Sequence, residues 1–405
     1  MKGSNGTRES LLLAAQTLFS QRGYPTASVS EICRQAGLAN GTFYCHFENK
    51  EEIFTALVER LKRVLHARVE RAATEERDPS KAILRAYRSV LAYAEEEPDL
   101  CRVGRSAEIL RMGIERLFRM DEADVLSEIL VAGIRAGRLR PVDPPTAAQA
   151  LLGIIEFAML RYVFWEPGAL TTDVLQALDD FILHGFDSGK PVAPVADAAK
   201  DRRAAGRIVQ DSPESGGKVT RRALLAQAER LFGEAGFFAT SISAITSAAG
   251  VAQGTFYVHF PSKVAVFVEL VRDVNSQLVA SQRKAIAGLE DRRQIERAGF
   301  RAFFGFIGGR PLAFRVLREA ELVNPEIGRW YYERLAKGYV RGLGDGIARG
   351  ELRELAPEPL AYALLGIGHA VALAAQAGGE RAYVPEDRVA SLLDALERGI
   401  VSPAD

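Results

Sequence analysis

A ten-residue string, Gly-Thr-Phe-Tyr-Xaa-His-Phe-Xaa-Xaa-Lys, occurs twice in this chain, at residues 41–50 and 254–263. The copies are 213 positions apart, and the same offset aligns residues 7–57 with 220–270 without a gap, with 23 identities in 51 positions. Weaker matches keep this register through most of each half, so the repeated unit is roughly 190 residues long, whereas solenoid repeats span only about 20–45 residues. The sequence therefore predicts a duplicated domain.

The overall composition limits the class of protein. A chain of 405 residues that are 48% hydrophobic is long enough for two domains with real cores. The formal net charge is zero, so the total charge gives no argument for nucleic-acid binding. No uninterrupted hydrophobic run reaches the roughly 18 residues of a membrane span, and the first residues lack a signal-peptide core. We therefore expect a cytoplasmic protein that does not contact a membrane.

The residues that carry catalytic or metal chemistry form no recognisable set. Cys33, Cys45 and Cys101 all lie in the first half without metal-ligand spacing. We interpret them as reduced thiols, with oxidant sensing by Cys45 as the alternative. No nucleophile–base–orienter set appears, so neither an enzyme nor a cofactor or metal site is expected.

Apolar residues recur at helical spacing along nearly the whole chain, and no alternating strand pattern appears, so the predicted fold class is all-α. In the first half, Gly23 ends the first apolar stripe. Ser28 and Glu31 have the spacing of a capping box at the start of a second helix. A third helix is expected from Leu38 to about His46. Helix, turn and short helix in this order predict a helix-turn-helix.

The repeated string has the residues that a DNA-reading helix needs. In a helix-turn-helix the second helix enters the major groove while the first crosses the DNA backbone. Phe43 and Phe47 share one helix face and are expected to anchor the short helix to the core. Tyr44 and His46 lie on other faces, where hydroxyl and ring nitrogens can meet DNA. The alternative is that these residues only pack or cover the surface, but recurrence of the whole string favours DNA binding.

At these residues the chain resembles the TetR family of bacterial transcriptional regulators. The resemblance covers residues 7–57 and 220–270, through a capping Ser, an Ile, Ala-Gly, the repeated string and its Lys. It implies two tandem all-helical units, each with a three-helix DNA-binding domain and a larger bundle that binds a small molecule and dimerises. The implied DNA contacts are Ser28, Asn40, Gly41, Thr42, Tyr44, His46 and Lys50 in the first unit, and Ser241, Gln253, Gly254, Thr255, Tyr257, His259 and Lys263 in the second.

The predicted domain organisation follows the repeat. It consists of a helix-turn-helix domain at 1–48, a regulatory bundle at 49–187, a linker at 188–217, a second helix-turn-helix domain at 218–261 and a second bundle at 262–405. The linker is rich in Gly, Pro, Ala and Ser, a composition typical of a flexible tether.

Two DNA-binding domains in one chain suggest an intramolecular pseudo-dimer, because family members ordinarily act as homodimers. Tethering raises the effective concentration to the order of millimolar, which favours pairing over a micromolar pool by about 4 kcal/mol. We predict that helices 146–162 and 173–186 pack against 359–376 and 386–400; the alternative is that these helices form only the core of each half. Further dimerisation stays open. Asn40 differs from its counterpart Gln253, so we expect an imperfectly palindromic operator.

The bundle segments at 50–137 and 263–350 are expected to surround an effector pocket. Polar candidates for its lining are His66, Tyr87, Arg102 and Glu156 in the first unit, and Arg315, Trp330, Tyr331 and His369 in the second. Clustered aromatic residues favour an apolar effector, although core packing explains them equally well. The predicted function is a sequence-specific DNA-binding regulator, a repressor of a double-stranded operator released by a small molecule. The alternatives are a regulator with one active DNA-binding domain and a scaffold that no longer binds DNA.

Overall fold

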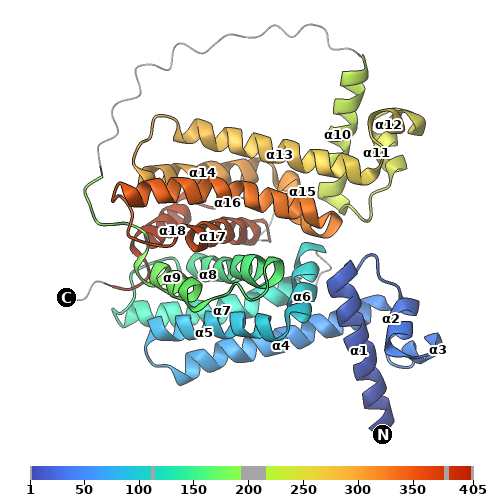
Figure 1. Ribbon diagram of the computed structural model, residues 1–405, viewed down its shortest axis with the longest axis horizontal. Helices are drawn as coiled ribbons and strands as arrows, with labels where there is room; N and C mark the ends of the chain where they lie inside the picture. Colours follow the sequence, from blue (N-terminus) through green and yellow to red (C-terminus); the bar gives the residue numbers. More distant parts are fainter. Residues whose placement is uncertain (1, 111–114, 193–215, 378–382, 403–405) are drawn as a thin grey trace. The chain divides into compact units, whose positions relative to one another are not determined.

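The computed structural model describes residues 2–110, 115–192, 216–377 and 383–402, and these residues fold into helices joined by short loops (Figure 1). Within the described ranges the only extended pairings are two isolated bridges. The all-α prediction is therefore confirmed. Most of the predicted linker, residues 193–215, lies outside the described residues.

The first repeat contributes α1 (Lys2–Arg22), α2 (Val29–Ala36), α3 (Asn40–Phe43), α4 (Lys50–Glu75), α5 (Pro79–Glu96), α6 (Pro98–Leu110), α7 (Glu115–Arg135), α8 (Pro144–Ala158), the π-helix η1 (Met159–Trp165) and α9 (Thr172–His184). The second repeat contributes α10 (Gly216–Ala235), α11 (Ile242–Ala248), α12 (Gln253–His259), α13 (Lys263–Ile286), α14 (Arg292–Gly309), α15 (Pro311–Val323), α16 (Pro325–Ala348), α17 (Pro357–Ala377) and α18 (Glu386–Arg398). We call α1–α3 the first head and α10–α12 the second head.

Local sequence signals explain where the helices begin and end. Ser28 accepts a hydrogen bond from the Glu31 amide (3.3 Å) while Glu31 accepts one from the Ser28 amide (2.9 Å), so the predicted capping box is confirmed. Gly37 ends α2 with φ of 70°, a left-handed conformation that favours glycine. The third helix is shorter than predicted, because α3 ends at Phe43 and residues 44–46 form turns.

The chain forms two compact units whose boundaries differ from those of the repeats. Unit 1 comprises Met1–Gly185, Tyr362–Ala370 and Asp394–Asp405, and unit 2 comprises Phe186–Ala361 and Val371–Leu393. Each unit therefore contains a short segment that belongs, by sequence, to the other repeat.

Unit 1 is built around α4, which packs against α5, α6 and α7, with the first head at its N-terminal end (Figure 1). In this unit α8 touches the segment Tyr362–Ala370 at a pair of glycines. A Cβ atom added to either Gly153 or Gly366 would overlap the backbone oxygen of the other, so glycine is needed where the two backbones meet. Phe157 lies on the same contact, with its ring centroid 5.2 Å from that of His369.

The C-terminal end of the chain adds a short extended pairing to unit 1. Leu139 and Val401 form an antiparallel bridge. The Arg140 amide donates to the carbonyl of Ile400 (2.9 Å), and the Ser402 amide donates to the carbonyl of Arg138 (3.2 Å).

Unit 2 repeats this pairing at equivalent positions. Asp187 and Leu352 form the bridge, and the Arg353 amide donates to the carbonyl of Phe186 (2.8 Å). The Ser188 amide donates to the carbonyl of Glu351 (3.3 Å). Each unit therefore holds the end of the other repeat in the same way.

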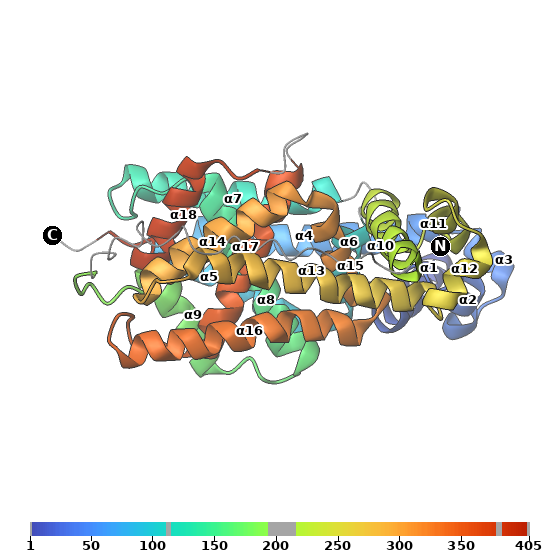
Figure 2. The same ribbon diagram turned by 90° about the horizontal axis from the view of Figure 1, so that it is seen from above.

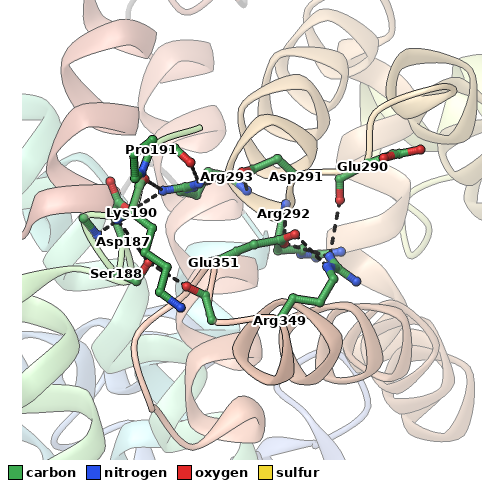
Figure 3. A network of polar contacts seen from close by, with 12 residues as sticks. Asp187, Ser188, Lys190, Pro191, Glu290, Asp291, Arg292, Arg293, Arg349 and Glu351 are labelled. Carbon is green, nitrogen blue, oxygen red and sulfur yellow. Dashed lines mark hydrogen bonds and ion pairs between the residues drawn. The ribbon is translucent and has the colours of Figure 1, made fainter. Parts of the chain in front are cut away.

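A buried polar network fixes this pairing in unit 2 (Figure 3). The Arg293 side chain, only 3% exposed, donates to Asp187 Oδ1 (2.8 Å), to the Lys190 carbonyl (2.6 Å) and to Asp291 Oδ2 (2.6 Å). These hydrogen bonds, first of all that with Asp291, raise the pKa of Arg293. A buried guanidinium requires such partners, so residues 187–191 are held firmly against the start of α14.

In the same unit the second head lies at the N-terminal end of α13, as in the first repeat (Figure 2). The helices α13, α14 and α16 run beside one another and form the body of the second bundle. This arrangement places the second bundle directly behind the second head.

Two helical segments, Pro144–Trp165 and Pro357–Gln376, are long and apolar enough by length and composition to cross a membrane, each with mean hydropathy 1.4. The sequence-based expectation that no segment reaches this length is therefore too strict. In the structure 72% and 78% of these windows are buried, which is the pattern of core helices.

Candidate DNA-binding site and sensing cleft

Each head carries a pair of phenylalanines that fix its recognition segment, which is residues 40–47 in the first head and 253–260 in the second. Phe43 and Phe47 are 0% and 2% exposed, and their ring centroids are 5.6 Å apart. Phe256 and Phe260 have the same burial and a spacing of 5.8 Å. The prediction that these rings anchor the short helix to the head is confirmed.

The opposite face of each recognition segment projects into solvent. Tyr44 is 62% exposed and Tyr257 is 54% exposed, unusual values for such large apolar rings. Cys45 is exposed as well, and its counterpart Val258 is 79% exposed. Cys45, interpreted from the sequence as a reduced thiol, is therefore a free cysteine at the projecting tip. Apolar groups here are suited to thymine methyl groups.

The other predicted DNA contacts surround this tip. Asn40 and Gly41 are exposed, whereas Thr42 and His46 are half-buried. The second head has the same pattern at Gln253, Gly254, Thr255 and His259. A Cβ atom at Gly41 or at Gly254 would meet nothing within 4 Å, so the space beside the backbone is open on this face.

The Lys50 ammonium group, which the resemblance implied as a phosphate contact, is hydrogen-bonded inside the head. It donates to the carbonyls of Tyr24 (2.9 Å), Pro25 (3.3 Å) and Ala27 (2.8 Å). It also lies 4.5 Å from the centre of the Tyr24 ring. An ammonium group has three donors, and here all three are directed into the loop between α1 and α2.

Lys263 repeats this arrangement in the second head. Its ammonium group donates to the carbonyls of Phe237 (2.9 Å) and Thr240 (2.7 Å), and it lies 4.2 Å from the centre of the Phe237 ring. Burial lowers the pKa of both lysines. In both heads the lysine therefore ties together the loop that leads into the helix-turn-helix.

The serines at the helix starts are occupied as caps, and the two heads differ there. The hydrogen bond from the Ser28 hydroxyl, followed by one from Arg22, lowers the pKa of Glu31 to about 2. In the second head, Ser241 accepts from the Ala244 amide (3.0 Å). Because alanine replaces Glu31 there, the second cap lacks the reciprocal half of the capping box.

Helix α15 holds the second head through its backbone. The Arg315 guanidinium donates to the carbonyls of Gly233 and Glu234 (2.8 Å each), in the last turn of α10. The Glu319 carboxylate accepts from the Phe237 amide (2.7 Å). Arg315 was predicted to line an effector pocket, but its place in the structure is this connection between head and bundle.

The first head is connected by other residues. Ser20 donates to Asp99 Oδ1 (2.6 Å), and Gln16 donates to Glu97 Oε2 (3.3 Å). Arg102, the counterpart of Arg315, donates instead to the Phe164 carbonyl in η1 (3.1 Å). The two repeats therefore couple head to bundle through different chemistry.

The second bundle contains a cleft of about 480 Å³ between α13, α14 and α16. Of the predicted effector residues, Trp330 lines it. Tyr331 is fully buried with its ring 4.8 Å from that of Tyr332, and His369 Nδ1 lies 2.8 Å from the Leu365 carbonyl.

The first-bundle candidates have structural partners. Tyr87 donates to the Leu175 carbonyl (3.2 Å) and to Asp179, and buried Glu156 pairs with Arg105. His66 is 39% exposed on α4. The structure does not bring these candidates together into one pocket-lining group.

The cleft contains an ion pair that sequence reasoning missed. Glu296 is 2% exposed and pairs with Arg292 one turn earlier on α14. Burial raises the pKa of Glu296, and burial likewise raises the pKa of Tyr339 on α16. The only sequence signal was an Arg and a Glu four residues apart on a largely apolar helix, a spacing that surface helices also show. Within the described residues there is no cluster of three or more possible metal ligands.

One family pattern matches the chain in both halves, and several known proteins are similar to part of it. The sequence pattern of the family described as "Bacterial regulatory proteins, tetR family" matches residues 11–57 and again 224–270. The uncharacterized HTH-type transcriptional regulator YdgC of Bacillus subtilis is 31% identical over 182 residues, which is 42% of this chain and 90% of that protein. The nucleoid occlusion factor SlmA of Vibrio vulnificus is 30% identical over 168 residues, 40% of this chain and 86% of that protein. The solved structure of PfmR, a regulator from Thermus thermophilus, is 28% identical to this chain with a TM-score of 0.38. The match covers 42% of this chain and 95% of that protein.

Proposed function

Because the chain belongs to the TetR family and is therefore a DNA-binding transcriptional regulator, we propose that it is a repressor with two unequal reading heads in one chain, released from its operator by a small molecule. The duplicated recognition segment carries the proposal. In each copy a buried phenylalanine pair orients an exposed tyrosine away from the head, as a base- or phosphate-contacting side chain must be oriented.

We assign the DNA contacts to the projecting face of each recognition segment and to the capped helix starts. They are Ser28, Asn40, Gly41, Thr42, Tyr44 and His46 in the first head, and Ser241, Gln253, Gly254, Thr255, Tyr257 and His259 in the second. Lys50 and Lys263 are left out, since their ammonium groups are bonded to carbonyls inside the heads.

The exchanged chain ends support an intramolecular pseudo-dimer. Tyr362–Ala370 and Asp394–Asp405 belong to the compact unit of the first repeat, and Phe186 begins the unit of the second. Two subunits related by a two-fold axis make the same contacts in both directions. Two repeats that pair in this way within one chain would therefore exchange equivalent segments. On this proposal the regulator acts in the cytoplasm, at the nucleoid when it is bound to DNA.

The heads differ where they would touch bases, so the operator half-sites are unequal on this proposal. Asn40 is replaced by Gln253, and Cys45 is replaced by Val258. Asparagine and glutamine both pair with adenine but reach to different depths. A more apolar tip in the second head favours a thymine methyl group at the corresponding position.

The test is genomic footprinting with the purified full chain, followed by titration of the recovered operator with Tyr44→Ala and Tyr257→Ala variants. We expect each variant to protect only one half-site and to lose affinity by a different factor. A symmetric footprint with equal losses would contradict unequal heads, and unchanged binding in both variants would contradict the assignment of the site.

One observation favours a second candidate, a regulator with a single dominant head. The recognition segment of the second head is a seven-residue helix, α12, while that of the first is helical over only four residues, α3. On this candidate Tyr257→Ala abolishes operator binding and Tyr44→Ala leaves it nearly unchanged, so the same titration separates the two.

A further inference from the structure

The cleft of the second bundle has an excess of positive charge. Its lining includes the basic residues Arg283, Arg292, Arg334 and Lys337 and the acidic residues Glu296 and Glu333. Both acids are already paired, because Glu296 contacts Arg292 and Glu333 accepts a hydrogen bond of 2.7 Å from Arg329 outside the cleft. The remaining basic groups therefore set the sign of the field in the cleft.

The rest of the lining is apolar and aromatic. Val279, Ile286, Ile295 and Leu335 line it together with the Trp330 ring. The Arg334 guanidinium lies 5.6 Å from the centre of that ring, so a cation and an aromatic surface are presented side by side. A volume of about 480 Å³ lies within the range of small-molecule sites, which are mostly apolar with a few polar groups that fix orientation.

The first repeat has the opposite charge at the equivalent sequence positions. With the offset of 213, Arg283 corresponds to Glu70, Arg334 to Asp121 and Lys337 to Asp124. The two repeats keep the same helical scaffold around these positions.

The polar centre of the cleft is also absent from the first repeat. Glu296 corresponds to Ile83 and Tyr339 to Leu126, and these two apolar side chains are 0% and 1% exposed. The first bundle therefore has packed aliphatic side chains at the position where the second has a buried carboxylate and a phenol.

We propose that the cleft of the second bundle binds an amphipathic anion, an apolar body that carries a carboxylate or similar negative group, and that the first bundle does not share this specificity. The proposal rests on the proposed function, since the anion would be the effector that releases the operator. Arg334 and Lys337 bind the anionic group while Trp330 and the aliphatic wall cover the apolar body. A regulator with two heads then has one anion sensor.

The inference is tested on the full chain with two fluorescent probes of matched shape. Anilinonaphthalene sulfonate carries a negative group, and N-phenylnaphthylamine is its neutral counterpart without the sulfonate. We expect the sulfonate to bind at least tenfold more tightly, with energy transfer from tryptophan that falls in a Trp330→Phe variant, in which Trp165 remains. Equal affinity for the two probes would overturn the proposal.

Charge-reversed variants locate the binding. Arg334→Glu and Lys337→Glu are expected to weaken sulfonate binding by tenfold or more and to leave the neutral probe unaffected. Lys284→Glu is the matched control, because Lys284 is an exposed basic residue of α13 that does not line the cleft. If Lys284→Glu weakens binding as much as Arg334→Glu, the long-range charge of the chain explains the selectivity and the proposal fails.

Operator binding measured on the same samples separates this inference from the proposed function. If the chain selects the sulfonate through Arg334 and Lys337 but binds no operator, the cleft stands and the repressor role fails. If the chain binds an operator but does not distinguish the two probes, the repressor role stands and the anion cleft fails.

Discussion

Replacing Lys50 by Met removes the ammonium group that closes the loop between α1 and α2 while keeping an apolar side chain of similar length. Three carbonyl groups lose their donor, those of Tyr24, Pro25 and Ala27. A hydrogen bond to a charged group contributes about 1.5–3 kcal/mol, which for three bonds gives a gross loss of roughly 4.5–9 kcal/mol. Removing a partly buried charge returns several kcal/mol, and water reaches the carbonyls of a half-buried site. We expect a net loss of about 2 kcal/mol.

The assay has two parts, because the structural role and a phosphate contact predict different results. Urea unfolding of the full chain measures the loss of stability. The dependence of operator affinity on salt counts phosphate contacts, since each one contributes about 0.9 to the slope of log K against log salt concentration. We expect Lys50→Met to lower stability and to leave this slope unchanged.

Lys263→Met is the matched comparison. Its ammonium group has two carbonyl partners in the structure, so the expected loss of stability is smaller, about 1 kcal/mol. If Lys50→Met instead leaves stability unchanged and reduces the slope by about 0.9, then the lysine contacts phosphate and our interpretation of its place in the head is wrong.

Three further predictions concern the caps, the head connection and the glycine contact. Because hydrogen bonds hold the pKa of Glu31 at about 2, below its usual 4.5, its contribution to stability is complete above pH 4.5 and is lost as the pH falls towards 2. The difference in melting temperature between the parent and Glu31→Gln should therefore shrink from pH 7 to pH 3, and a constant difference would contradict this. Arg315→Met should speed amide exchange at the C-terminal end of α10 by about tenfold or more, as expected for the loss of a charged hydrogen bond, and leave α1 unchanged; equal exchange in both helices would count against the connection. Gly366→Val should lower the free energy of unfolding by about 1–3 kcal/mol through overpacking, and an unchanged urea midpoint would show that the helices separate at no cost.

The features that sequence predicted are those set by local patterns. The capping box at Ser28 and Glu31 lies within four residues, and the anchoring of Phe43 and Phe47 follows from helical periodicity. These signals depend on neighbours along the chain. The duplicated heads can therefore be predicted from the sequence alone.

The features that sequence missed depend on partners far along the chain. Lys50 bonds to carbonyls 23–26 residues earlier, and whether a lysine points outward or into such a loop is decided by the tertiary fold. Arg315 reaches carbonyls 81 and 82 residues away. A charged pair such as Arg292 and Glu296 has the same spacing on an exposed helix as on a buried one, so only the packing of α13 and α16 around it reveals the cleft.

The exchanged chain ends also determine when the protein can finish folding during translation. Unit 1 contains the N-terminal head and the segments Tyr362–Ala370 and Asp394–Asp405, so its fold is incomplete until the ribosome has made nearly the whole second repeat. At about 5–20 residues per second, that delay after residue 185 lasts roughly 10–40 s. During this time the α8 surface around Gly153 lacks the helix that later covers it. Newly made chains are therefore most exposed to chaperones and to self-association at that surface, before the second repeat arrives.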